Sequence, residues 1–472
     1  MTLDAAIVGS GPNGLAAAIT LAQHGCSVLV IEASDTIGGG TRSAQLTLPG
    51  FIHDVCSAIH PLGVASPFFQ SVPLKDFGLE WINPDIVVAH PMADGTAVAM
   101  YRSLERTVEA LGADGQAYRR LLKPFVAGAD NLFLQVLGPF RLPRHPRLMM
   151  RFGMRGLRSA RGLAKAWFRD ERTQGMFAGM AAHSVQPLDQ WLTAAVGLMF
   201  SITIHSGGWP VARGGSQQIA VAMRRYLESL GGEILTGTRI TALSDIPPAK
   251  AILFDVGPRQ LNRIAGNALP AGYRRKLERF RYGPGVFKID WALDGPIPWQ
   301  AQECRRAGTV HVGGTFEEVA AAEQAAWTIS PAERPFVLVG QQSLYDPTRA
   351  PPGKQTGWAY CHVPHGSTFD MTERIESRIE QFAPGFRTLI LGRHVMSPAD
   401  FQHYNENYVG GDITGGVMDM WQLFTRPTAR RNPYTTPAPN IFQCSSSTPP
   451  GGGVHGMCGY FAARAALRRL SR

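Results

Sequence analysis

Two short apolar runs near the start of the chain flank a stretch that favours a helix. Residues 5–8 and 27–31 carry no charged side chain, as is typical of strands buried on both faces of a parallel sheet. Between them, residues 15–24 are rich in Ala and Leu, and Gly25 is suited to end a helix. The order strand, helix, strand within about 30 residues predicts a βαβ unit.

The same kinds of element recur much later in the chain. Gly214-Gly215-Ser216 predicts the start of a helix with Ser216 as its N-cap, and Gly231-Gly232 predicts its end. Apolar runs of strand length follow this helix, and two of them predict an antiparallel sheet. The expected helices are 217–230 and 457–469, and the expected strands are 233–236, 251–254, 286–293, 336–340 and 440–444.

The turn between the first strand and the first helix has the spacing of a dinucleotide-binding site. It reads Gly9-Ser10-Gly11-Pro12-Asn13-Gly14, and Glu32 follows the second strand. Gly9 permits the tight turn, Gly11 lets backbone approach a pyrophosphate, and Gly14 lets the helix pack closely on the strand. The free N–H groups of the helix N-terminus favour phosphate, and Glu32 can accept hydrogen bonds from a ribose.

Two further glycine turns favour FAD over NAD as the bound nucleotide. Residues 37–42 (Ile-Gly-Gly-Gly-Thr-Arg) can wrap the other side of the pyrophosphate, with Arg42 as a fixed cation. Near the other end, residues 451–456 (Gly-Gly-Gly-Val-His-Gly) present the N-terminus of a last helix. We therefore expect three widely separated glycine turns to converge on one flavin nucleotide.

The segments VGSGPNGLAAAITLAQHGCSVLVIEASDTIGGGTRS and STPPGGGVHGMCGYFAARAAL resemble the phytoene-desaturase-like flavoproteins, which belong with FAD amine oxidases and carotenoid isomerases. The resemblance implies an α/β fold: a discontinuous FAD-binding (Rossmann-like) domain with a doubly wound parallel sheet. It also implies an α+β substrate domain with an antiparallel sheet and a helical lid. The FAD-binding parts would be 1–69, 214–260 and 435–472, and the substrate-domain parts would be 70–213 and 261–434.

The resemblance also implies where FAD would lie. Its pyrophosphate would contact the first two glycine turns, its adenosine ribose Glu32, its adenine Ile240, and its flavin ring the last glycine turn. The implied FAD contacts are Gly9, Ser10, Gly11, Pro12, Asn13, Gly14, Glu32, Ala33, Gly39, Gly40, Thr41, Arg42, His60, Ile240, Gly452, Gly453 and Val454. A displaced arginine in the second turn and a short connection after residue 241 indicate a shortened, pyridine-nucleotide-oxidoreductase-like subgroup.

His455 and His60 are the candidate catalytic residues, because the resemblance implies that both of their segments approach the flavin. The alternatives are structural: His455 caps its own loop, and His60 is a buried, hydrogen-bonded histidine. Trp209 and Tyr460 are candidates for an apolar substrate wall or, alternatively, for ordinary core positions. No metal is expected. The histidines that lack ligand spacing are His183, His205, His311 and His362.

Charge adds a candidate membrane contact. The net charge of +10 favours anionic partners. Basic residues recur every three or four positions through 144–172 with bulky apolar residues between them, which predicts a basic amphipathic helix. It indicates an anionic membrane surface as a partner; the alternative is a solvated helix face. Nucleic acid is not expected, because no recognition module accompanies the charge.

The cysteine content and the apolar segments indicate the cellular compartment. The six cysteines show no paired spacing, no signal peptide is visible, and the apolar run 194–204 is too short to span a bilayer. We expect a cytoplasmic protein, with peripheral membrane contact through 144–172 as an addition to this.

These observations predict an FAD-dependent oxidoreductase that is phytoene dehydrogenase-like. It would move a hydride between the flavin and an apolar substrate, isoprenoid or lipid-like, with oxygen or a quinone as the electron acceptor. Two alternatives stay open: a flavin-dependent polyene isomerase without net redox change, and a non-catalytic interaction protein that contains FAD.

Overall fold

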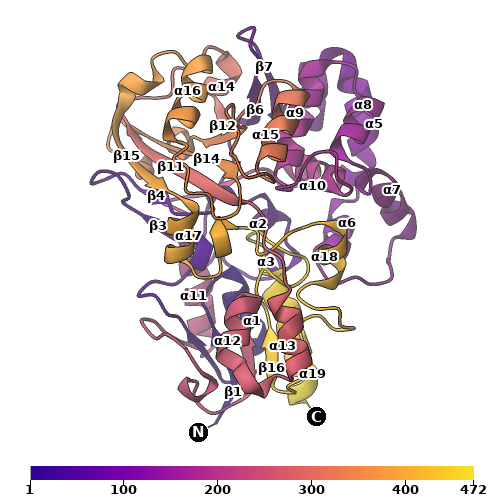
Figure 1. Cartoon of the computed structure of the whole chain (residues 1–472), viewed down its shortest axis with the longest axis vertical. Helices are drawn as coiled ribbons and strands as arrows, with labels where there is room; N and C mark the ends of the chain where they lie inside the picture. Colours follow the sequence, from indigo (N-terminus) through magenta and orange to yellow (C-terminus); the bar gives the residue numbers. More distant parts are fainter. Residues whose placement is uncertain (1, 472) are drawn as a thin grey trace.

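A computed structural model describes residues 2–471, and a five-stranded parallel sheet forms its lower part (Figure 1). The strand order is β16-β10-β1-β2-β9, and every neighbouring pair is parallel. These strands are β1 (Leu3–Val8), β2 (Val28–Ile31), β9 (Glu233–Leu235), β10 (Ala249–Phe254) and β16 (Ile441–Gln443). The sheet thus draws its strands from three segments that lie far apart in the sequence.

Both faces of the parallel sheet are covered because its strands are apolar on both sides. Ala5 and Ile7 of β1 pack into one core cluster with the first group of helices, and Ala6 and Val8 pack into another. The first group is α1 (Pro12–Ala22), α11 (Gln217–Ser229) and α19 (Met457–Leu470), and the opposite group is α12 (Pro258–Ala265) and α13 (Ala271–Glu278). This doubly wound arrangement confirms the predicted α/β class.

The helices α12 and α13 extend the second nucleotide-domain segment past the boundary that we expected after residue 260. Leu261, Ile264 and Leu277 are buried in the same cluster as Ile252 of β10. Their apolar faces therefore belong to the parallel sheet, and the second domain resumes with β11 (Gly285–Leu293).

A seven-stranded sheet forms the core of the second domain, in the order β15-β11-β14-β13-β12-β6-β7. Its neighbours are antiparallel, apart from the parallel pair β6 and β12. The strands besides β11 are β6 (Ile86–Pro91), β7 (Ala97–Tyr101), β12 (Ala307–Val312), β13 (Val337–Gly340), β14 (Gln355–Val363) and β15 (Ile390–Met396). The predicted antiparallel runs 286–293 and 336–340 are confirmed as β11 and β13.

Shorter elements complete the sheets and their connections. Two small antiparallel pairs join β3 (Ser43–Ala44) to β4 (His53–Asp54) and β5 (Trp81–Ile82) to β8 (Val211–Ala212). The helices outside the lid and the parallel sheet are α2 (Pro61–Ala65), α3 (Pro67–Gln70), α14 (Gln302–Arg305), α15 (Phe316–Ala325), α16 (Thr372–Phe382), α17 (Pro398–Tyr404) and α18 (Met420–Thr425).

Seven helices form a lid beside the second sheet, on the right of Figure 1. They are α4 (Leu104–Ala110), α5 (Gly115–Val126), α6 (Ala129–Val136), α7 (Pro146–Gly156), α8 (Ala160–Trp167), α9 (Glu171–Ala182) and α10 (Thr193–Ser206). The basic segment 144–172 is not one helix. Helix α7 ends at Gly156. A second helix, α8, begins at Ala160, and Ser159 caps it by accepting a hydrogen bond from the Gly162 N–H.

A buried ion-pair network joins the two domains. The Arg349 guanidinium contacts the carboxylates of Asp54 and Asp346 at 2.9 Å each, and it donates to the Ala212 carbonyl. Asp54 also accepts from the Ser216 N–H at 2.7 Å. Removing one partner from such a network leaves a buried charge uncompensated.

No helix within residues 2–471 is long and apolar enough to cross a membrane.

Candidate nucleotide and substrate site

The three glycine turns meet around one cavity of about 440 Å³ at the carboxyl ends of the parallel strands. A Cβ atom built on Gly39 would lie 3.2 Å from the Cα of Gly11, so the first two turns touch. Gly452 and Gly453 of the last turn line the same cavity. The volume falls within the range of ligand-binding cavities.

Most of the predicted cofactor residues line this cavity. They are Gly9, Gly11, Pro12, Asn13, Glu32, Ala33, Gly39, Gly40, Thr41, Arg42, His60, Ile240, Gly452, Gly453 and Val454. Ser10 and Gly14 do not line it. Ser10 lies behind the turn on Glu32, and Gly14 packs against Gly9 and Asp255 inside α1. Their positions stabilise the turn rather than face a ligand.

Glu32 is held in place by four donors. Its Oε2 accepts from the N–H of Ser10 at 2.9 Å and from the Ser10 hydroxyl at 2.6 Å. Its Oε1 accepts from the Ser34 N–H at 2.9 Å and from Arg42 at 3.2 Å. Arg42 also donates to the Thr36 carbonyl, so its charge is partly balanced by Glu32. The carboxylate is thus oriented before any ribose binds.

Asp255 is a site residue that the sequence analysis missed. It follows β10 directly, and its Oδ2 accepts from the Gly14 N–H at 2.8 Å. Burial raises its pKa well above the ordinary value, and the nearby charge of Glu32 adds to this rise. A protonated Asp255 would not repel a phosphate. The only signal in the sequence was an acid directly after a predicted strand.

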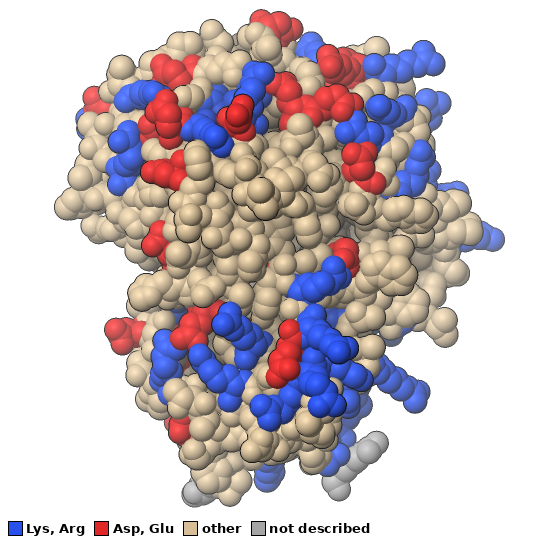
Figure 2. All heavy atoms as spheres, in the orientation of Figure 1, with Lys and Arg blue, Asp and Glu red and all other residues tan. Residues whose placement is uncertain are grey.

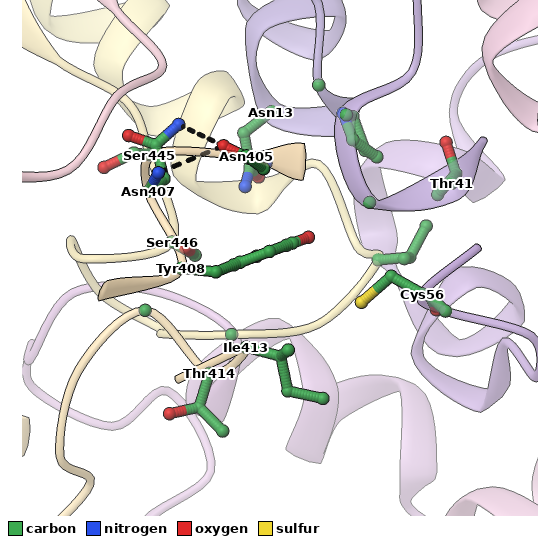
Figure 3. Close-up of a pocket in the computed structure, with 18 of the residues that line it drawn as sticks. Asn13, Thr41, Cys56, Asn405, Asn407, Tyr408, Ile413, Thr414, Ser445 and Ser446 are labelled. Atoms are coloured by element: carbon green, nitrogen blue, oxygen red, sulfur yellow. Dashed lines mark hydrogen bonds between the residues drawn. The ribbon is translucent and has the colours of Figure 1, made fainter. Parts of the chain in front are cut away.

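A loop from the second domain closes over the second glycine turn. Tyr404 donates from its hydroxyl to the Gly39 carbonyl at 2.7 Å, and its ring lies 5.6 Å from the Arg42 guanidinium. Figure 3 shows the ring of Tyr408 extending across the cavity in the direction of Cys56. Asn405 accepts a hydrogen bond from the Asn407 side chain at 2.9 Å, which stiffens this loop.

His60 lies at the cavity wall, where the sequence placed it. Its Nε2 is 2.8 Å from the Ser216 hydroxyl, and burial lowers its pKa to about 4, so the ring is neutral near pH 7. Ser216 was predicted as an N-cap, but no N-cap hydrogen bond is made by its side chain. Its hydroxyl is engaged by His60 instead.

His455 does not face the cavity. Its Nδ1 accepts from the Met457 N–H at 3.0 Å, and its Nε2 lies 3.1 Å from the Gly451 carbonyl. Burial lowers its pKa to about 4. Both ring nitrogens are used within the last glycine turn, which favours the alternative that His455 caps this loop at the start of α19.

Beyond the glycine turns, the cavity continues between the second sheet and α10 as a mostly aromatic and apolar chamber. Trp209 is part of its wall and donates from its indole N–H to the Thr309 hydroxyl at 3.0 Å. Tyr460, the other predicted wall residue, lies on α19 outside the chamber, where it packs against Phe461 of the same helix and Phe68 of α3. The chamber residues are His183, Val185, Val196, Met199, Phe200, Trp209, Thr309, Leu338, Trp358, Tyr360 and His362.

Comparison with known proteins agrees with this geometry. The NAD(P)-binding Rossmann-like domain family matches residues 7–71. The rat pyridine nucleotide-disulfide oxidoreductase domain-containing protein 2 is 25% identical over 99% of this chain and 94% of its own length. The lycopene-forming phytoene desaturase of Pseudescherichia vulneris is 23% identical over 98% of each chain. Putrescine oxidase bound to putrescine superposes over 100% of both chains with a TM-score of 0.62 and 16% identity.

Proposed function

Because the chain is a homologue of the phytoene desaturases within the FAD amine oxidase superfamily, we propose that it is an FAD-dependent oxidoreductase of a largely apolar substrate. The observation that carries this proposal is the single cavity that joins three glycine turns to an aromatic chamber. A nucleotide at the turns would hold its reactive end toward a substrate in the chamber.

The residues at each part of the cavity fit FAD. Gly11, Gly39 and the N-terminus of α1 would bind the diphosphate, and the oriented carboxylate of Glu32 would accept the ribose hydroxyls. The N-terminus of α19 would place a partial positive charge behind Gly453 and Val454. When bound, FAD supplies the acceptor for a hydride, and the chamber walls exclude water from that transfer.

The flavin content of the purified protein tests this proposal. We expect the purified protein to be yellow and its acid extract to contain FAD in a 1:1 ratio to chain, because all three glycine turns share one cavity. A colourless protein that takes up no flavin on reconstitution would refute the proposal. Anaerobic turnover with pre-reduced flavin and no acceptor would instead indicate a polyene isomerase. A bound flavin that no lipid extract reduces would indicate a structural role for FAD.

We also propose that the protein docks on anionic membrane to collect its substrate. Exposed apolar side chains gather where α18 meets the loop after α6, and the rings of Phe140 and Phe424 pack edge to face at 6.1 Å. Such side chains are rarely left exposed together without a partner. Their exposed fractions are Phe140 89%, Leu142 90%, Trp421 75% and Phe424 55%.

Basic side chains lie beside these apolar side chains, and Figure 2 shows Lys and Arg projecting from the right edge of the molecule, where Figure 1 places α7. Arg144, Arg147 and Arg151 are exposed on α7 and the turn that precedes it, and α6, α7 and α18 occupy the same side of the molecule in Figure 1. Apolar tips beside arginines match the chemistry of an anionic bilayer surface. Met418, two residues before α18, lines the cavity, so this surface and the cavity share one segment.

Vesicle co-sedimentation tests the docking surface. We expect binding to phosphatidylglycerol-containing vesicles at low salt, weak binding to pure phosphatidylcholine, and loss of binding in a W421S/F424S variant. The control Ile329→Ser removes an even more exposed apolar residue, 98% exposed, from a loop away from α18 and should bind normally. Equal binding by both variants, or none by the wild type, would refute this proposal.

A further inference from the structure

The imidazole of His362 is a polar group in the wall of the chamber. His362 is the last of three alternate residues of β14, after Trp358 and Tyr360, whose side chains share one face of the strand. All three line the cavity. Two of them are aromatic, so His362 brings a titratable ring into an otherwise largely apolar wall.

A buried carboxylate fixes the orientation of the His362 ring. Both carboxylate oxygens of Glu323, on α15, lie close to its Nδ1, Oε2 at 2.8 Å and Oε1 at 2.9 Å. Side chains of both residues are at most 2% exposed. An acceptor-only carboxylate at this distance requires a proton on Nδ1, which leaves the lone pair of a neutral ring on Nε2.

Nε2 of His362 is buried and has no hydrogen-bond partner among residues 2–471. Buried polar atoms normally have partners, and those without one are the points where a ligand group fits. His183 lies near it in the chamber; burial lowers the pKa of His183 to about 3, and a charge on His362 would lower it further. The imidazole of His183 is therefore uncharged and cannot balance the charge of an anionic ligand.

The carboxylates that line the cavity all belong to the nucleotide end: Glu32, Asp255 and Glu406. The Glu323 carboxylate lies behind the imidazole and is bound to its Nδ1–H, so it offers no direct hydrogen bond to an ammonium group at Nε2. The remaining N–H groups of such an ammonium would face an apolar wall, which is costly. A hydroxyl group donates one hydrogen bond and carries no charge, so it matches an unprotonated imidazole nitrogen in an apolar wall.

We infer that His362, oriented by Glu323, determines specificity by accepting a hydrogen bond from a substrate hydroxyl. The substrate class is then an apolar molecule with one hydroxyl group, rather than a plain hydrocarbon or an amine. This inference rests on the proposed function for the identity of the chamber as the substrate site. His362 is a specificity-determining residue here, and Glu323 is the positioning residue behind it.

Binding by a matched pair of probes tests the inference. Calorimetry on the purified holoenzyme would compare geraniol with myrcene, a monoterpene hydrocarbon without the hydroxyl, and with geranylamine. We expect wild type to bind geraniol roughly tenfold more tightly than either. His362→Phe should bring the geraniol-to-myrcene ratio close to one. His362→Gln, whose amide oxygen can stand in for Nε2, should keep most of the preference.

His24→Phe makes the same substitution at an exposed histidine outside the cavity lining, so it is the matched control and should leave the ratio unchanged. Flavin content and melting temperature are measured on every variant, so absence of flavin counts against the proposed function and not against this inference. A wild-type ratio close to one, tightest binding of the amine, or a ratio unaltered by His362→Phe would overturn the inference. The wild-type ratio decides it even if His362→Phe does not fold.

Discussion

Alanine at Gly11 is the smallest change that tests the convergence of the glycine turns. Its Cβ would lie 2.7 Å from Oδ2 of Asp255, and besides its chain neighbours only this carboxyl group lies within 4 Å. A carbon and an oxygen cannot approach so closely without displacement. The buried carboxyl also accepts the Gly14 N–H, so it has little freedom to move away.

Two separate effects follow from this contact. Overpacking at a buried site costs about 1–3 kcal/mol of folding stability, so Gly11→Ala should lower the melting temperature. The methyl group would also stand where the pyrophosphate is expected. In an Asp255→Ala background the contact between the new methyl group and the Asp255 carboxyl is removed. Any remaining loss of FAD affinity then comes from a contact between the methyl group and FAD.

Titration of apoprotein with FAD, followed by flavin fluorescence, measures that defect. We expect G11A/D255A to bind FAD at least 100-fold more weakly than D255A, which is about 2.7 kcal/mol. Gly153→Ala is the control, because nothing lies within 4 Å of its Cβ. Equal FAD affinity in G11A/D255A and D255A would show that Gly11 does not face the cofactor, and the reasoning about the first turn would fail.

Three further outcomes follow from the buried polar groups. Asp255→Asn should raise the melting temperature at pH 8 and change it little near pH 4, because a raised native pKa destabilises the fold only above the ordinary carboxyl range; a constant difference across pH would contradict this. Arg349→Met should cost about 3–5 kcal/mol in denaturant unfolding, because Asp54 is left buried without its cation; a loss below about 1 kcal/mol would count against the network. His455→Ala should cost about 1 kcal/mol at pH 7.5 by removing the acceptor for Met457 N–H, with an unchanged pH profile of activity. Because the native pKa of about 4 lies below the usual 6.5, wild type loses stability from pH 6.5 down to about pH 4, and its advantage over the variant should shrink over that window; a variant with normal stability and an altered pH profile would restore a catalytic role.

Local features of the nucleotide domain could be predicted because each depends on residues close in sequence. The first glycine turn and Glu32 sit at strand ends that apolar runs define, and the last glycine turn directly precedes the helix α19. The parallel sheet then brings those ends to one edge, whatever the rest of the chain does. For this reason most of the expected cofactor residues share one cavity.

Pairings between distant elements could not be predicted. Glu323 and His362 belong to a helix and a strand whose contact depends on the register of the second sheet. The role of Asp255 could not be predicted, because it depends on the side chain pointing toward the N–H of Gly14, 241 residues away in the sequence. The regular spacing of basic residues through 144–172 predicted one helix, but this spacing gives no information about the helix end at Gly156 or the N-cap at Ser159. The end of the second FAD-binding segment could not be predicted, because it depends on which of the two sheets α12 packs against.

The position of β16 bears on how the protein matures in the cell. Strand β16 pairs with β10 at the edge of the sheet, and α19 covers α1 and brings the last glycine turn to the cavity. During translation, β1, α1 and β2 emerge hundreds of residues before these partners. The part of α1 that packs against α19 therefore stays uncovered until residues 457–470 have been synthesised. On the proposed function, FAD would be enclosed by all three glycine turns only after the last turn has been synthesised, hundreds of residues after the first.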